Sequence, residues 1–197
     1  MKRDIILAGV GGQGILSIAT VIGDAALSEG LYLKQAEVHG MSQRGGDVQS
    51  NLRLSSEPIH SDLIAKGGAD LIISLEPMEA LRYMEYLKED GWIVTSSVPF
   101  VNIPNYPALE EVLSHVQAFE HHVLLDVEQL AKEAGAPVQA ANMVLLGAAI
   151  PMLGIEYDKV IAGVKRIFER KGEKVVNANI AAIEAGYKAV NGSTSWK

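Results

Sequence analysis

The feature that most constrains this chain is a glycine-rich turn that directly follows a short apolar segment near the N-terminus. The segment 3–8 shows no alternation of apolar and polar residues, which predicts a strand buried on both faces. A helical pattern covers residues 13–29, so the turn joins a strand to a helix. The turn residues of interest are Gly9, Gly11, Gly12, Gln13 and Gly14.

The spacing Gly9-x-Gly11-x-x-Gly14 fits a phosphate-binding fingerprint, and strand, turn and helix are the context that this fingerprint requires. Glycines let a ligand approach the main chain, and the helix presents free N–H groups and a positive dipole end to an anion. We therefore predict anion or nucleotide binding; a turn that serves tight packing alone is the alternative. The acid that binds the ribose of NAD should end the second strand. The nearest candidate, Glu37, comes late, which disfavours an ordinary dehydrogenase.

A second polar, glycine-rich stretch covers residues 38–51 and follows the second expected strand, 31–37. In open α/β sheets, loops at the ends of strands are where ligands usually bind. Arg44 is followed by Gly45 and Gly46, which places a guanidinium on flexible backbone and suits a phosphate or a carboxylate. A solvated connecting loop is the alternative to this functional interpretation.

The remaining pattern predicts an α/β fold: a three-layer Rossmann-like sheet, mostly parallel, with helices on both faces and a small antiparallel excursion. The excursion would pair an alternating strand at 48–54 with a partner at 58–61. The other expected elements are strands at 69–75, 92–96 and 123–126, helices at 78–88 and 109–116, and a loop at 98–107.

From residue 127 onward the pattern is helical. The helix 140–150 is apolar on all sides and should be buried, with Asn142 as a polar exception bonded to backbone. The stripe along 174–190 predicts a helix that packs on the body of the same domain, with docking of a partner helix as the alternative. We expect residues 1–190 to form a single domain and residues 191–197 to be a flexible tail.

Composition restricts the possible functions. A net charge of -7 disfavours nucleic acid as a partner. No apolar run approaches a membrane span and no signal peptide is visible, so we expect a cytoplasmic protein without a membrane partner. The chain has no cysteine and cannot ligate an iron–sulfur cluster through thiolates. A metal site is not expected, because only His121 and His122 adjoin and a strand would point them to opposite faces.

No triad, carboxylate pair or metal-ligand spacing can be assembled, so the chain suggests a binding cleft without chemistry of its own, as in one piece of a larger enzyme. At this point it resembles a known family, the gamma module of 2-oxoacid:ferredoxin oxidoreductases. As a free-standing chain it is most similar to small subunits of the indolepyruvate (arylpyruvate) enzymes. The resemblance spans nearly the whole chain and rests on the segments 9–14, 37–46 and 142–148, which read GVGGQG, EVHGMSQRGG and NMVLLGA.

The resemblance implies an enzyme that oxidatively decarboxylates a 2-oxoacid on thiamine diphosphate, transfers the acyl group to coenzyme A (CoA) and passes electrons to ferredoxin. Thiamine diphosphate, magnesium and the iron–sulfur clusters would then lie on a large partner subunit, and this chain would be inactive alone. It also implies that this chain supports assembly and CoA or cofactor binding. The candidate cofactor-facing residues are Gly9, Gly11, Gly12, Gln13, Gly14, Ser42, Gln43, Arg44 and Gly45.

Three alternatives stay open from the sequence. The first is a stand-alone NAD(P)- or nucleotide-binding Rossmann-type protein, the second is a gamma subunit specific for pyruvate or 2-oxoglutarate, and the third is a module that senses a nucleotide or an acyl-CoA.

Overall fold

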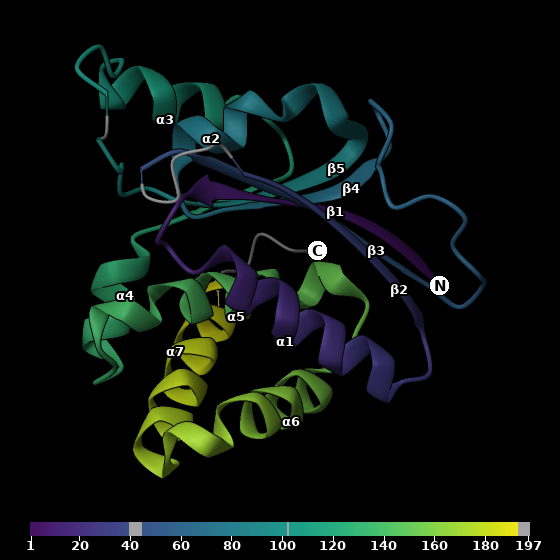
Figure 1. The fold of residues 1–197 in the computed structure, drawn as a ribbon. Helices are drawn as coiled ribbons and strands as arrows, with labels where there is room; N and C mark the ends of the chain where they lie inside the picture. The colour runs from purple at the N-terminus through teal and green to yellow at the C-terminus, as the bar shows by residue number, and fades with distance from the viewer. Residues whose placement is uncertain (40–44, 102, 193–197) are drawn as a thin grey trace.

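The computed structural model describes residues 1–39, 45–101 and 103–192. Its strands are β1 (Lys2–Val10), β2 (Tyr32–His39), β3 (Asp47–Ser55), β4 (Ala69–Ser74), β5 (Leu87–Ser96) and β6 (His122–Leu125). Its helices are α1 (Ile15–Ser28), α2 (Pro77–Arg82), α3 (Leu109–Gln117), α4 (Val127–Glu133), α5 (Ala141–Leu153), α6 (Tyr157–Phe168) and α7 (Glu173–Asn191). Figure 1 shows one sheet between two helical layers, with α2 and α3 on one face and the other helices on the opposite face.

The sheet has the spatial order β2-β3-β1-β4-β5-β6. The pairs β1–β4, β4–β5 and β5–β6 are parallel, and β3 runs antiparallel to both of its neighbours, β1 and β2. The predicted three-layer, mostly parallel sheet is therefore confirmed. The predicted partner strand at 58–61 is wrong, because β3 finds both of its partners in β1 and β2 and residues 56–61 form no strand.

β1 is buried on both faces, as its uninterrupted apolar run predicts. Ile5, Ile6, Leu7 and Ala8 are all fully buried, and alternate members belong to two different clusters of core side chains. Ile5 and Leu7 pack on the side of α1 and α5, whereas Ile6 and Ala8 pack on the side of α2. A strand with helices on both faces has no wet side, so its sequence shows no alternation.

The predicted helix 78–88 is too long. α2 ends at Arg82, a short 3-10 turn follows at Met84–Tyr86, and β5 already begins at Leu87. Leu87 pairs with Ala69 of β4, and Lys88 forms an ion pair with Asp70. Gly91, which follows the predicted helix in the sequence, lies inside β5. Pairing with the neighbouring strand has therefore overridden the helical pattern of this segment.

The C-terminal helices pack on the same domain, as the stripe along α7 predicts. Ile183 and Val190 are buried, and the other stripe residues, Val176, Ile180 and Tyr187, pack against the same core cluster. α5 is buried on nearly all sides and lies against α7. In the part of the chain that the structure describes, no single helix is long and apolar enough to cross a membrane; only the bent pair α4 and α5 passes by length and composition.

Candidate functional site

The glycine turn between β1 and α1 adopts backbone angles that favour glycine. Gly12 has φ 105° and Gly14 has φ 86°, in the left-handed region that other residues avoid. Gly14 is also the N-cap of α1 and provides no side-chain cap, so the first N–H groups of the helix carry no capping side chain. A side chain at Gly9 would meet Oε1 of Gln13 at 2.9 Å. Both the backbone angles and the lack of space for a side chain therefore require glycine in this turn.

Gln13 ties this turn to the end of β4. Its Oε1 accepts a hydrogen bond from the N–H of Val10 at 2.7 Å, and its Nε2 donates to the carbonyl of Leu75 at 3.1 Å. Both atoms of the amide are therefore engaged within the protein. The role of this side chain that the structure shows is to hold the turn, and ligand binding by Gln13 stays a prediction.

The two glycine-rich loops lie side by side. The N–H of Gly11 donates to the carbonyl of Gly46 at 2.8 Å, and the N–H of Gly45 donates to the carbonyl of Gly11 at 3.4 Å. This pairing continues the β1–β3 ladder beyond Val10 and Asp47. Gly45 and Gly46, the end of the second glycine-rich stretch, therefore lie beside the glycine turn, whereas the predicted site residues Ser42, Gln43 and Arg44 lie outside the described residues.

The strand order also argues against an NAD site at the glycine turn. In a dinucleotide-binding fold, the acid at the end of the second strand lies next to the glycine turn because that strand is adjacent to the first. Here β3 separates β2 from β1, so Glu37 lies two strands away, about 10 Å across the sheet. Glu37 is therefore not placed to grip a ribose bound at the glycine turn.

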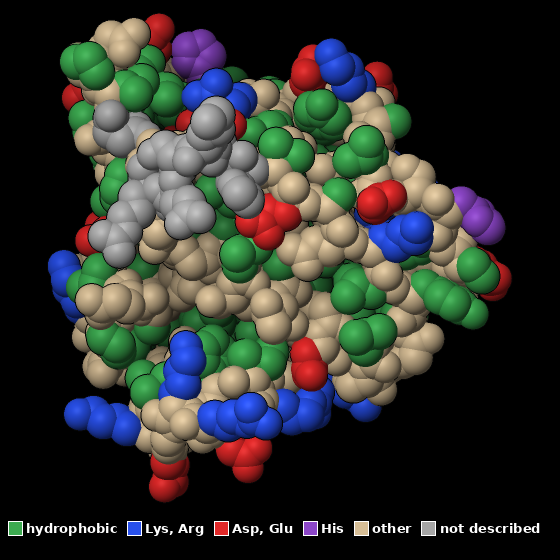
Figure 2. Space-filling model, in the orientation of Figure 1, with side chains coloured by type: hydrophobic (Ala, Val, Ile, Leu, Met, Phe, Trp, Pro, Cys, Tyr) green, Lys and Arg blue, Asp and Glu red, His purple; other side chains and the backbone are tan. Residues whose placement is uncertain are grey.

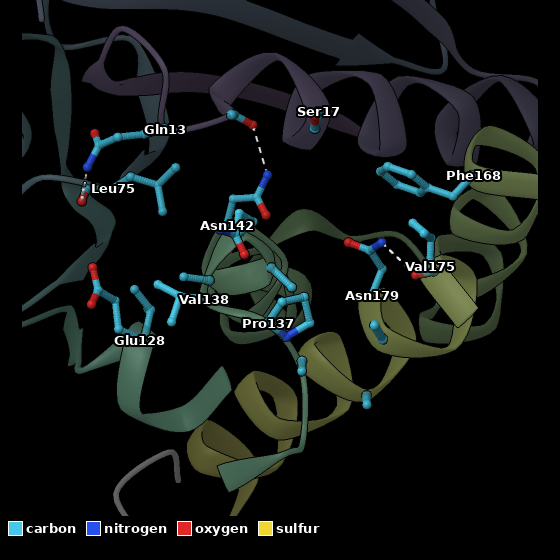
Figure 3. Close-up of a pocket in the computed structure, with 18 of the residues that line it drawn as sticks. Gln13, Ser17, Leu75, Glu128, Pro137, Val138, Asn142, Phe168, Val175 and Asn179 are labelled. Carbon is cyan, nitrogen blue, oxygen red and sulfur yellow. Dashed lines mark hydrogen bonds between the residues drawn. The ribbon is translucent and has the colours of Figure 1, made fainter. Parts of the chain in front are cut away.

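A cavity of about 1370 Å³ opens beside the glycine turn. Figure 3 shows Gln13, Leu75 and Glu128 on one side of Asn142, and Ser17, Phe168 and Asn179 on the other. Of the predicted site residues, Gly12, Gln13 and Gly14 line it, whereas Gly9, Gly11 and Gly45 do not. Its other walls come from residues 96–100, 127–128, 135–142, 168–171 and 173–181, with gaps.

Sequence reasoning found only one wall of this cavity. Most of the other walls lie more than 80 residues further along the chain, and among them only Asn142 belongs to a segment that the family resemblance singles out together with the turn. The break at Gly135-Ala136-Pro137 is a second signal in the sequence, since it marks a helix end that lines the space.

Asn142 joins the glycine turn to α5. Its Nδ2 donates to the carbonyl of Gly14 at 3.1 Å, and its side chain lies on the cavity wall (Figure 3). A Cβ at Gly14 would lie 2.6 Å from this nitrogen, so the contact requires glycine. The prediction of a buried asparagine bonded to backbone is confirmed, and the bond closes one side of the site.

Cations flank the far side of the cavity. Lys171 and Lys174 belong to its lining, and Nζ of Lys171 lies 5.3 Å from the ring centroid of Phe168. Figure 2 shows lysine and arginine side chains gathered along the edge formed by α6 and the turn into α7, on a chain whose net charge is -7. This placement suits an anionic group of a ligand, with Glu128 and Glu173 as the acids in the same lining.

A buried acidic cluster lies behind the cavity, at the end of β4. Glu76 is only 1% exposed, and its carboxylate accepts hydrogen bonds from the hydroxyl of Tyr106 and from the N–H of Glu79. Burial raises the pKa of Glu76, although these hydrogen bonds oppose the shift. Glu79 holds Arg82 through two hydrogen bonds of 2.7 and 3.1 Å. Burial, aided by the charge of Asp47, also raises the pKa of Tyr83 to about 12.

Within the described ranges, no group of three histidine, aspartate or glutamate side chains is placed to hold a metal ion. The cavity wall offers amides, hydroxyls, lysines and carboxylates, but the carboxylates are spread and not paired. What this arrangement can do chemically is to bind and orient an elongated, partly apolar anion.

Residues 4–189 match the protein family described as pyruvate ferredoxin/flavodoxin oxidoreductase. The chain belongs to this family. Among curated members, the indolepyruvate oxidoreductase subunit IorB of Thermococcus kodakarensis is 38% identical, covering 95% of this chain and 96% of the relative. The subunit of the same name from Archaeoglobus fulgidus is 33% identical over 99% of both chains.

Solved structures related to this family have the same fold. A 2-oxoglutarate:ferredoxin oxidoreductase from Magnetococcus marinus, with 2-oxoglutarate, CoA and succinyl-CoA bound, matches with TM-score 0.77 and 22% identity. That match covers 98% of this chain and 32% of the longer one. The gamma subunit of a keto/oxoacid ferredoxin oxidoreductase from Geobacter sulfurreducens matches with TM-score 0.70 and 22% identity, covering 97% and 99%. These TM-scores establish the shared fold, and the likeness in sequence comes from the curated relatives.

Proposed function

We propose that this chain is the small subunit of an indolepyruvate ferredoxin oxidoreductase, an enzyme that decarboxylates an arylpyruvate oxidatively to an acyl-CoA and reduces ferredoxin. The observation that carries the proposal is the likeness to IorB subunits over nearly the full length of both chains. The pairing of the two glycine loops supports it, because the segments that resemble the family meet in one place.

The role of this chain within that enzyme is binding and assembly. The sequence has no cysteine, so a large partner subunit would carry the iron–sulfur clusters, and with them thiamine diphosphate and magnesium. Ferredoxin would be reached through the complex. We assign CoA to the side of the glycine turn, since a cavity of about 1370 Å³ with largely apolar walls and two lysines suits a pantetheine arm and phosphates.

The test is co-expression of this chain with the large subunit, followed by an assay of ferredoxin reduction with indolepyruvate and CoA. We expect activity only when both chains and CoA are present. Activity of the isolated chain, or a complex that reduces ferredoxin without CoA, would contradict the proposal. Addition of NAD(P)H to the isolated chain is the control for a nucleotide-binding protein, and we expect no micromolar binding.

A second candidate substrate has one observation in its favour. The 2-oxoglutarate synthase subunit KorC of Methanothermobacter marburgensis is 28% identical over 96% of this chain. The same complex should therefore be assayed with 2-oxoglutarate and pyruvate beside indolepyruvate. A specificity constant at least about tenfold higher for indolepyruvate is the result that we expect, and the reverse order would reassign the enzyme.

A further inference from the structure

One wall of the cavity is a loop with little regular structure of its own. Val98, Pro99 and Phe100 line the cavity, and they belong to the connection between β5 and α3. Phe100 is 42% exposed and the next residue, Val101, is 66% exposed. Prolines also remove main-chain donors from this connection, so its position depends on a few polar attachments.

Two attachments lead to the same carboxylate. The hydroxyl of Tyr106 donates to the side chain of Glu76, and the N–H of Phe100 lies near enough to the same carboxylate to lower its pKa. These two donors stand at opposite ends of the exposed part of the loop. A third donor, the N–H of Glu79 at 2.8 Å, belongs to the first turn of α2. The carboxylate therefore joins both ends of the loop to α2.

Capping of α2 alone does not explain a buried glutamate here. α4 is capped in the same way by Asp126, which accepts from the N–H of Gln129 at 2.8 Å and remains exposed to solvent. Glu76 is 1% exposed, and a buried carboxylate costs free energy unless its hydrogen bonds are satisfied. Burial also raises its pKa, which means that the surroundings disfavour the charged form of this carboxylate. The loop donors are what distinguish Glu76 from the ordinary cap.

Adjacent residues at the end of β4 hold two walls of the cavity, which follow the neighbouring strands β1 and β5. The carbonyl of Leu75 accepts from Gln13 and so holds the glycine turn, and the next residue, Glu76, holds the loop that carries Phe100. The N–H of Leu75 in turn donates to the carbonyl of Ala8 in β1 at 3.2 Å. The distance between the two walls is thus fixed through a single rigid strand end.

We infer that Glu76 is a positioning residue for the coenzyme: chiefly through Tyr106, it fixes the loop after β5 that forms one wall of the cavity. The identity of the ligand rests on the proposed function, whereas the geometry does not. Glu76 touches no ligand in this reading and acts only through the loop.

The first test measures hydrogen exchange on the full chain. Tyr106→Phe removes one donor to the carboxylate, and Glu76→Gln replaces one acceptor oxygen by a donor. We expect the backbone N–H groups of the non-proline residues in 97–101 and 103–106 to exchange about tenfold faster or more in both variants, because a hydrogen bond to a charged group is lost. In the double variant, the Tyr106 substitution should add little to the effect of Glu76→Gln, since both substitutions disrupt the same hydrogen bond.

The matched control is Tyr83→Phe. It removes a phenolic hydroxyl from the other end of α2, where Asp47 and not the loop influences the pKa of that hydroxyl. We expect exchange at residues 97–101 and 103–106 to stay as in the wild type. Unchanged exchange in Tyr106→Phe and Glu76→Gln, or an equal acceleration in Tyr83→Phe, would overturn the inference.

The second test uses the assembled enzyme. Tyr106→Phe and Glu76→Gln should raise the KM for CoA about tenfold and leave kcat and the KM for the 2-oxoacid within about twofold. A fall in kcat with an unchanged KM for CoA would overturn the inference. If the wild-type complex does not consume the 2-oxoacid with CoA, the proposed function fails instead, and the exchange measurement still decides the role of Glu76.

Discussion

Gly186 in the middle of α7 offers the sharpest test of the packing, because two known effects of Gly186→Ala have opposite signs. Alanine is the better helix former by about 1 kcal/mol, so propensity alone predicts stabilisation. The structure predicts the reverse. A Cβ at this position would lie 1.9 Å from the carbonyl oxygen of Val144 and 2.8 Å from its carbonyl carbon, both in the backbone of α5.

The magnitude follows from how far the helices must separate. Restoring an ordinary van der Waals contact requires roughly 1.5 Å of movement between α5 and α7, and backbone atoms cannot rotate away as a side chain can. Overpacking of this kind costs about 3 kcal/mol or more. After the gain in propensity, we expect Gly186→Ala to lower the free energy of unfolding by about 2 kcal/mol or more.

The assay is urea unfolding followed by far-UV circular dichroism, with Gly23→Ala as the control. Gly23 is also buried inside a helix, α1, but a Cβ there would meet only the end of the Leu33 side chain, at 3.1 Å. We expect Gly23→Ala to change stability by less than about 1 kcal/mol in either direction. A Gly186→Ala chain as stable as the wild type would refute the reasoning, because α5 and α7 could then not be in backbone contact.

Three further predictions concern the site. Gln13→Leu removes two hydrogen bonds of the glycine turn, and we expect a loss of about 2 kcal/mol in the free energy of unfolding, measured by urea denaturation. An unchanged free energy of unfolding would show that these two hydrogen bonds do not stabilise the turn. The double substitution Lys171→Ala and Lys174→Ala should weaken CoA binding to the assembled enzyme about tenfold, measured by calorimetry, with a smaller effect in high salt; Lys188, paired with Glu184 away from the cavity, is the control for general loss of charge. Because burial raises the pKa of Glu76 above 4.5, the folded chain retains this proton to higher pH than the unfolded chain does. The free energy of unfolding should therefore carry a contribution that falls as the pH rises from 4.5 through the raised pKa, and this slope should vanish in Glu76→Gln; an identical pH profile in both proteins would contradict the assignment.

Local patterns were sufficient wherever the physics is local. The glycine turn could be predicted because left-handed backbone angles at Gly12 and Gly14 restrict the residue type directly. The buried strand before it and the stripe along α7 follow from the periodicity of apolar residues, which reports the faces that each element buries. The lack of cysteine required no structure either, and it excludes thiolate ligation of an iron–sulfur cluster by this chain.

Contacts between distant segments decided the rest. The position of β3 between β2 and β1 was not predictable, since the choice of strand partner depends on pairing energies that no single segment encodes. The same cause ended α2 early in favour of β5. The cavity joins the glycine turn to Asn142, 128 residues further on. The sequence by itself thus determined most of the elements, the turn and the resemblance to the family. Only the tertiary structure decided which strands pair, which walls meet and that Glu76 holds one of them, because burial and hydrogen-bond partners arise only when the chain has packed.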